Sequence, residues 1–156
     1  MVSNEEISVN KRNGRGKESL NIEKIHSMVG FATEGITGVS ASHVEMNSGI
    51  QFFDGVSTAD IQQILIKSAN DLISLENPNY QYVAARLLLF QLRKQLFHRL
   101  WDHPKFIDHI KTLIDKGLYD KDILANYDES EIDRMGMWID HERDYNFTYA
   151  GLRQVM

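Results

Sequence analysis

The sequence predicts a mainly α-helical protein that carries a small β-hairpin at its N-terminus. Apolar residues recur at three- and four-residue steps over most of the chain, whereas a short segment near the start alternates apolar and polar residues. With 156 residues, 42% of them hydrophobic and 25% charged, the chain can bury one core and add an extension. We therefore expect one domain over residues 1–95 and a helical extension over 96–156.

The hairpin is predicted from an Asn-Gly turn between two short strands. Ile7 and Val9 alternate with polar residues before Asn13-Gly14, and residues 18–22 can return antiparallel. Asn-Gly favours a hairpin because both residues tolerate positive φ. Two strands are only marginally stable alone, so this hairpin must rest on the helices.

Four helices are predicted after the hairpin, each from its apolar spacing and its end signals. Glycines, small polar caps and one proline mark their limits. The predicted ranges are 22–36, 40 or 42 to 53, 57–73 after a Ser-Thr-Ala-Asp capping box, and 77 to about 94 or beyond after Asn77-Pro78.

The extension is predicted to begin near residues 96–104, where aromatic and basic residues precede a new helix. That helix covers 106–114 and is ended by Gly117, and shorter helices are expected over 122–126 and 130–140. Residues 147–152 look like an element that enters a larger structure.

Composition excludes several classes of function. The chain has no Cys, which excludes disulfides, thiolate metal sites and thiol chemistry. A net charge of −5 argues against general nucleic-acid binding, and no apolar run is long enough to span a bilayer. Glu5 and Glu6 stand where a signal peptide would be basic. We expect a cytoplasmic protein with no nucleic-acid or membrane partner.

Cations around the hairpin turn form a candidate anion-binding site. Lys11, Arg12, Arg15, Lys17 and Lys24 fall close together, between a strand and the start of a helix. Such cations can hold a polyphosphate by charge-assisted hydrogen bonds. By itself, however, a basic turn is more often a solvated surface than a binding site.

The histidines of the sequence do not predict a metal site. His98 with Asp102, Asp108-His109, or Asp140-His141-Glu142 could be drawn as ligand sets, but no H-E-x-x-H or similar spacing is present. Structural or solvated His is the better interpretation.

Five stretches of the chain together form a pattern that is shared with a known family. They are Lys11-Arg12-Asn13-Gly14; Asn21-Ile22-Glu23-Lys24-Ile25-His26; Ala32-Thr33-Glu34-Gly35; Asp54-Gly55 with Thr58-Ala59-Asp60-Ile61; and Tyr80-Gln81-Tyr82-Val83-Ala84-Ala85-Arg86-Leu87. This pattern resembles the ATP-cone of the large subunit of class I ribonucleotide reductases, especially the enterobacterial class Ia enzymes and those of tailed phages. A further match, Asp140-His141-Glu142-Arg143-Asp144 before Phe147-Thr148-Tyr149, falls where the catalytic domain of that family begins.

The resemblance implies a four-helix bundle covered by the hairpin, with ATP or dATP bound between them as an allosteric effector, together with Mg²⁺. It also implies a role for each matching residue. The implied contacts are Lys11, Arg12 and Lys94 with the phosphates; Glu18 and Asn21 with adenine; Lys24 and Thr58 on the polar wall; Val9, Ile25, Ile61 and Phe90 in the apolar pocket; and Asp60 in the response to dATP.

Each implied role has a structural alternative. The four apolar residues also fit the core stripes of their elements, Lys94 suits the end of any helix, and Asp60 suits any first turn. Gln62 and Gln91 stand where the enterobacterial relatives are expected to carry His, and the hairpin is one residue longer, which affects the placement of Glu18. Inhibition by dATP is therefore left open.

The expected function is allosteric nucleotide sensing that controls a ribonucleoside-diphosphate reductase in deoxyribonucleotide synthesis. Without Cys the chain should not be catalytic alone, so we expect part of a longer subunit or a split-gene product. Its expected partners are the remainder of the large subunit, the radical-generating small subunit and a cone-mediated oligomer, in the host cytoplasm if the gene is phage-encoded. The alternatives are a free-standing nucleotide-binding regulator, related to cone-bearing transcriptional repressors, and a helical interaction module.

Overall fold

The computed structural model describes residues 7–10, 16–49, 52–98 and 103–156, which form two compact units. Unit 1 comprises Met1–Gln91 with Tyr145–Met156, and unit 2 comprises Leu92–Asp144. The division falls inside helix α4 (Tyr80–Phe97), and each unit is described by itself. Over the described ranges, no helix is both long and apolar enough to cross a membrane.

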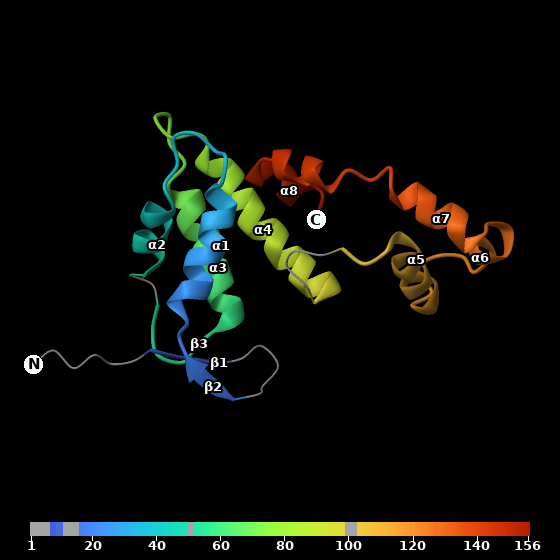
Figure 1. Ribbon diagram of the computed structural model, residues 1–156. Coiled ribbons are helices and arrows are strands. Elements are labelled where there is room, and N and C mark those ends of the chain that lie inside the picture. The colour runs from blue at the N-terminus through green and yellow to red at the C-terminus, as the bar shows by residue number, and fades with distance from the viewer. Residues whose placement is uncertain (1–6, 11–15, 50–51, 99–102) are drawn as a thin grey trace, which may run out of the picture. The chain divides into compact units, whose positions relative to one another are not determined.

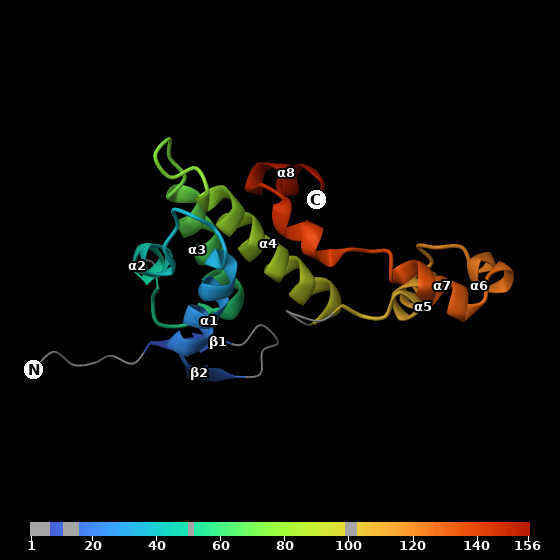
Figure 2. The same ribbon diagram turned by 45° about the horizontal axis from the view of Figure 1, so that its top comes forward.

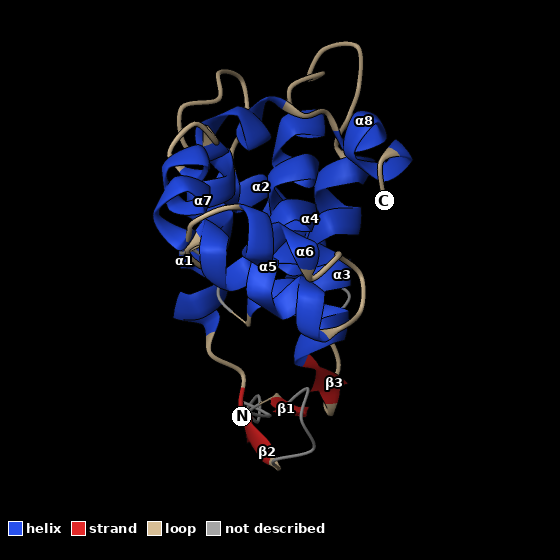
Figure 3. Cartoon of the chain, turned by 90° about the vertical axis from the view of Figure 1, so that its right-hand side faces the viewer, coloured by secondary structure: helices blue, strands red, loops and turns tan. Residues whose placement is uncertain are grey.

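Unit 1 is a helical bundle with a small sheet at one end. Helices α1, α2 and α3 lie side by side in Figures 1 and 2. The three strands lie together at the end of the bundle where α1 and α3 begin (Figure 3). The mainly helical fold with an N-terminal hairpin is confirmed. The helices are α1 (Ile22–Thr33), α2 (Ala41–Gly49), α3 (Thr58–Asp71), α4 up to Gln91, and α8 (Tyr149–Gln154).

The sheet contains three strands in the order β2-β1-β3, one more than the sequence predicts. The strands β1 (Ser8–Asn10) and β2 (Lys17–Ser19) form the predicted antiparallel hairpin. The unexpected strand, β3 (Val56–Ser57), pairs parallel to β1. Two residues are too few to show an alternating pattern, so only the fold reveals this pairing.

The predicted capping box of α3 is confirmed. The Ser57 side chain accepts a hydrogen bond from the Asp60 backbone N–H at 3.0 Å, and the Asp60 carboxylate accepts one from the Ser57 N–H at 3.4 Å. Gly35, with φ of +69°, follows the end of α1, as the glycine signal predicts.

Several predicted helix limits are wrong. The first helix ends at Thr33 instead of residue 36, and the third ends at Asp71 instead of residue 73. The second helix ends at Gly49 and does not reach Phe53; Ile50 and Gln51 lie outside the described residues. The fourth begins at Tyr80, because the Asn77-Pro78 segment is followed by a turn in which the Gln81 N–H donates to the Pro78 carbonyl.

Hydrogen bonds from α4 hold the far end of unit 1 together. The Ser40 N–H, just before α2, donates to the Tyr80 hydroxyl at 3.0 Å. The Arg86 guanidinium donates to the Glu34 carbonyl at 2.6 Å and lies 5.3 Å from the centre of the Tyr145 ring. Arg86 thus satisfies a carbonyl at the end of α1 and contacts the segment before α8. The side chains buried most completely in this unit include Val29, Val44, Leu65, Val83, Leu87 and Phe90.

Unit 2 contains the end of α4, the three predicted helices and most of the 3₁₀ helix η1 (His141–Asn146). Ile107 and Ile110 of α5 pack with Ile132 of α7 in its core. The predicted stop at Gly117 is confirmed by its φ of +69°. The helices are α5 (Phe106–Asp115), α6 (Asp122–Asn126) and α7 (Glu129–Gly136), the last ending before the predicted residue 140.

The packing of α7 on α5 requires glycine at position 136. A Cβ at Gly136 would lie 2.5 Å from the Cβ of Phe106, which does not lie at the far end of a flexible side chain. We expect Gly136→Ala to destabilise the protein by about 1–3 kcal/mol, because overpacking outweighs the higher helix propensity of Ala. Urea unfolding followed by circular dichroism measures this change.

Gly30→Ala is the matched control. Gly30 lies inside α1 with nothing within 4 Å of an added Cβ, so this variant should gain about 0.5–1 kcal/mol. Equal stability changes in the two variants would contradict the close approach of α7 to α5.

Candidate functional site

Val9 is the middle residue of β1, the central strand of the sheet. It pairs with Glu18 of β2 on one side and with Val56 of β3 on the other, and only 2% of its surface is exposed. Because β2 leads into α1 and β3 into α3, β1 connects the starts of two helices. The predicted site residues Val9, Glu18, Asn21 and Thr58 therefore come from neighbouring segments.

Polar contacts fasten β1 to the loop before β3. The Ser8 N–H and hydroxyl both donate to Oδ1 of Asp54, at 3.0 and 2.6 Å. The Asn10 side chain donates to the Gly55 carbonyl at 2.7 Å, and the Gly55 N–H donates to the Ser8 carbonyl at 2.8 Å. Sequence reasoning missed these contacts, because it used Asp54-Gly55 as a helix stop and as part of the family pattern, neither of which indicates a partner in β1.

The same contacts lower the pKa of Asp54. The Ser8 hydroxyl and the Ser8 N–H both donate to the ionised carboxylate and so favour it. A lowered pKa means that the charged form is the one the folded hairpin prefers.

Capping side chains occupy the N-termini of α1 and α3, next to the sheet. The Asn21 side chain accepts from the Lys24 N–H at 2.9 Å, and Ser57 caps α3. The other N–H groups of a first helical turn, together with the helix dipole, favour an anion. Lys24 is exposed on the first turn of α1, and Thr58 is half-buried as the first residue of α3.

The predicted apolar residues are all buried in unit 1. Ile25 of α1 is 7% exposed, Ile61 of α3 is 6% exposed and Phe90 of α4 is 1% exposed. These three residues and Val9 are as buried as core residues, which agrees with their positions on the predicted apolar faces of their elements. Packing alone accounts for their burial.

Asp60 has a defined structural role, because its carboxylate completes the capping box. Oδ2 accepts from the Ser57 hydroxyl at 2.6 Å as well as from the Ser57 N–H. A ligand that moved this side chain would break the half of the capping box that Asp60 supplies, while the Ser57 side chain still accepts from the Asp60 N–H. Any effect of Asp60 on a nucleotide response would thus be linked to the start of α3.

The two glutamines at expected His positions link α3 to α4. Gln62, which is 6% exposed, donates from Nε2 to the Leu87 carbonyl at 2.9 Å. Gln91 accepts at Oε1 from the Gln63 side chain, also at 2.9 Å. Gln63 was not singled out in the sequence. The first bond joins a side chain of α3 to the backbone of α4, and the second joins two side chains, so both link the helix pair.

The predicted phosphate-binding residues are only partly described. Lys11 and Arg12 lie outside the described residues. Lys94 is exposed in the last turn of α4, which belongs to unit 2.

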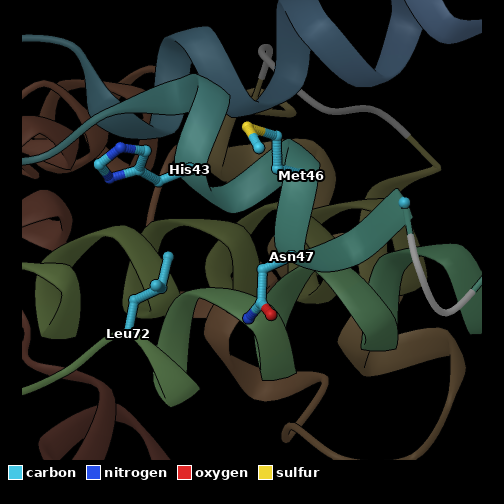
Figure 4. A pocket seen from close by; sticks show the side chains of 5 residues that line it. His43, Met46, Asn47 and Leu72 are labelled. Atoms are coloured by element: carbon cyan, nitrogen blue, oxygen red, sulfur yellow. The ribbon is translucent and has the colours of Figure 1, made fainter.

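A separate hollow of about 560 Å³ opens on α2, away from the predicted residues. It is lined by His43, Met46, Asn47 and Gly49 of α2 and by Leu72 just after α3 (Figure 4). Asn47 points across to α3, where it donates to the Ser68 carbonyl at 3.2 Å. None of the predicted site residues lines this hollow.

The small sheet thus adjoins the N-termini of α1 and α3, both of which have a side-chain cap. Helix N-termini favour anions, so a small helical domain of this kind suits an anionic effector. The ATP cone domain family matches residues 7–95, which span the sheet and almost all of α1 to α4. The chain belongs to the ATP-cone family.

Curated relatives extend the match beyond the cone. The chain is 45% identical over 149 residues to the ribonucleoside-diphosphate reductase subunit alpha of Buchnera aphidicola from Acyrthosiphon pisum, covering 96% of this chain and 19% of the relative. It is 43% identical over 152 residues to the ribonucleoside-diphosphate reductase 1 subunit alpha of Escherichia coli, covering 97% of this chain and 20% of the relative. For the phage T4 subunit alpha the identity is 41% over 149 residues, covering 96% and 19%.

The chain thus spans about one fifth of the length of these relatives. Its ATP-cone corresponds to the nucleotide-sensing region for overall activity in reductase alpha subunits.

Removing the Asp54 carboxylate should loosen the hairpin. We expect Asp54→Ala to speed amide exchange at Ser8 and Gly55, because both amides take part in the β1–loop contact. In the wild type, the contribution of Asp54 is present above its ordinary pKa of 3.8 and is lost as the pH falls through its lower folded value. Hydrogen exchange followed by NMR measures both effects.

Asp71→Ala is the control for this experiment, because Asp71 lies at the far end of α3 and pairs only with exposed Lys67 among the described residues. Unchanged exchange at Ser8 in Asp54→Ala would contradict the anchoring role of that carboxylate.

Gln62 is expected to contribute to stability through its bond to α4. Gln62→Leu should cost about 0.5–1.5 kcal/mol, because it removes a buried hydrogen bond with little change in volume. The exposed neighbour offers a control, since Gln63→Leu should stay within about 0.5 kcal/mol of the wild type. Chemical denaturation of both variants tests the difference, and a larger loss for Gln63→Leu would refute it.

Proposed function

We propose that this chain binds ATP or dATP, with Mg²⁺, beneath its N-terminal hairpin and so reports the nucleotide pool to a ribonucleoside-diphosphate reductase. One observation carries the proposal: β1 joins two capped helix starts within a domain of the ATP-cone family. The helix starts supply N–H groups and a favourable dipole for phosphates.

Phosphate binding in this proposal combines cations from three segments. Lys11 and Arg12 of the hairpin turn, Lys24 of α1 and Lys94 of α4 would pair with the polyphosphate, and Mg²⁺ would offset the remaining charge. Lys24 is supported by its exposed position in the first turn of α1.

Adenine recognition would fall to Glu18 and Asn21. Glu18 pairs directly with Val9, and its carboxylate can accept from the exocyclic amine. Asn21 uses Oδ1 to cap α1, so its NH₂ group is the part that would meet a ring nitrogen. The purine would rest on the apolar layer of Val9, Ile25, Ile61 and Phe90.

Discrimination between ATP and dATP requires more than one contact. The nucleotides differ by one hydroxyl, and a net hydrogen bond contributes only about 0.5–1.5 kcal/mol. Regulation therefore needs two conformations or assemblies with different affinities for each nucleotide. In this proposal, the Gln62–Leu87 and Gln63–Gln91 bonds would bias the spacing of α3 and α4 between such states.

The sensing region would act on a larger assembly. The relatives are alpha subunits, about five times the length of this chain, so the remainder of such a subunit is the partner that the matches favour. Contact with the small subunit, and association of cones with one another, are further parts of the proposal. Mass measurements with ATP, with dATP and without nucleotide would show whether binding drives association.

Titration calorimetry tests the proposed site directly. Wild-type chain should bind ATP with one site, and Lys24→Ala should weaken binding at least about tenfold, since a charge-assisted bond is worth about 1.5–3 kcal/mol. The variant carrying both Lys11→Ala and Lys94→Ala should weaken it further. Lys67→Ala, on the exposed surface of α3, is the control and should bind as the wild type does.

Failure of the wild type to bind either nucleotide would contradict the proposal and favour a helical interaction module. Binding that Lys24→Ala leaves unchanged would place the nucleotide away from the start of α1.

A further inference from the structure

We infer that His103, His141 and Asp144 form a binding site for a zinc-like divalent transition-metal ion in unit 2. Each residue offers one ligand atom, and these atoms lie within 4.8 Å of one another. All three side chains are half-buried. The site lies outside the ATP-cone and stands independently of the nucleotide proposal.

Two parts of unit 2 that are distant in the sequence bring these side chains together. His103 comes shortly before α5, whereas His141 and Asp144 lie on η1. A 3₁₀ helix has three residues per turn, so residues at i and i+3 share a face. Nδ1 of His141 accordingly lies 3.9 Å from Oδ2 of Asp144. The His103 and His141 rings stack with centroids 3.5 Å apart and planes 7° from parallel.

Surrounding side chains hold the cluster in position. Arg93 of α4, which is 4% exposed, donates from Nη2 to Oδ2 of Asp144 at 3.2 Å. The ring of Phe97 meets His103 edge-on, with centroids 6.2 Å apart. Such supporting contacts orient the ligands of metal sites. The positive charge of Arg93 partly offsets the attraction of the Asp144 carboxylate for a metal cation, so we expect moderate affinity for the metal.

Metal binding requires a small movement of the imidazole rings. Bonds of about 2.0–2.2 Å in a tetrahedral site place ligand atoms roughly 3.4 Å apart, so the present spacing must close slightly. Parallel stacked rings also direct their lone pairs side by side, and the rings must tilt for both to reach one ion. The terminal torsion of His is broad, and both side chains are partly exposed, which permits this tilt.

The ligand set selects the kind of metal. Two imidazoles with one carboxylate suit zinc and its neighbours, whereas Mg²⁺ and Ca²⁺ prefer oxygen ligands throughout. Three protein ligands leave a fourth position for water. Because the ligating imidazoles must be neutral, acid should release the metal.

Titration of the whole chain with ZnCl₂, without nucleotide or chelating buffer, tests the inference. We expect one Zn²⁺ per chain by calorimetry, and a visible absorption band when Co²⁺ replaces it in a tetrahedral site. His103→Ala and His141→Ala should each weaken binding at least about tenfold, because each removes a direct ligand. Circular dichroism checks that both variants remain folded.

His98→Asn is the matched control. His98 is exposed in the same unit, and Asn tolerates its positive φ of 57°, so this variant loses an imidazole without touching the cluster. It should bind Zn²⁺ as the wild type does. A wild type that binds no Zn²⁺, or binding that survives in both His103→Ala and His141→Ala, would overturn the site.

Discussion

The pairing of β1 with strands on both sides is the constraint on which the arrangement of the cone depends. A two-stranded hairpin is marginally stable in water, and here β3 and the Ser8–Asp54 contacts give it the support it needs. Because β2 runs into α1 and β3 runs into α3, fixing β1 also fixes where these two helices begin. The hairpin and the helix starts thus form one structural unit, and a ligand held there would contact all of them.

Capping serves stability and binding at the same place. Asn21 and Ser57 each satisfy an N–H at a helix start, while other first-turn N–H groups keep the local potential positive. Asp60 is part of the same arrangement, since its carboxylate bonds the Ser57 hydroxyl. In the proposed site, a ligand that contacts Asp60 would act on its bonds to the N-cap residue Ser57 and so on the start of α3. Farther along, Gln62 ties α3 to the backbone of α4, which offers a route for such a change to spread.

Unit 2 is held together by a small apolar core and by polar contacts. Its core is small, with Ile107, Ile110 and Ile132 at the centre, and close approach of α7 to α5 depends on the absence of a side chain at Gly136. Polar contacts around Asp144 supplement this small core. A metal ion there would link η1 to the segment before α5, as small domains often require an added cross-link. Because the chain has no Cys, such a link could only use His and carboxylate ligands.

The sequence by itself determined the elements whose signals are local. The pairing of the first two strands agrees with the predicted hairpin, whose Asn13-Gly14 turn lies outside the described residues. The start of α3 followed from its capping box, and the end of α5 from Gly117. Matching stretches also pointed to the ATP-cone family, which residues 7–95 confirm. Tertiary structure alone decided the pairing of β3 with β1, the anchoring of Ser8 by Asp54, the bond from Gln62 to Leu87 and the meeting of His103 with His141. Each of these joins residues distant in the chain, and their meeting depends on how whole elements pack, which spacing along one segment cannot encode.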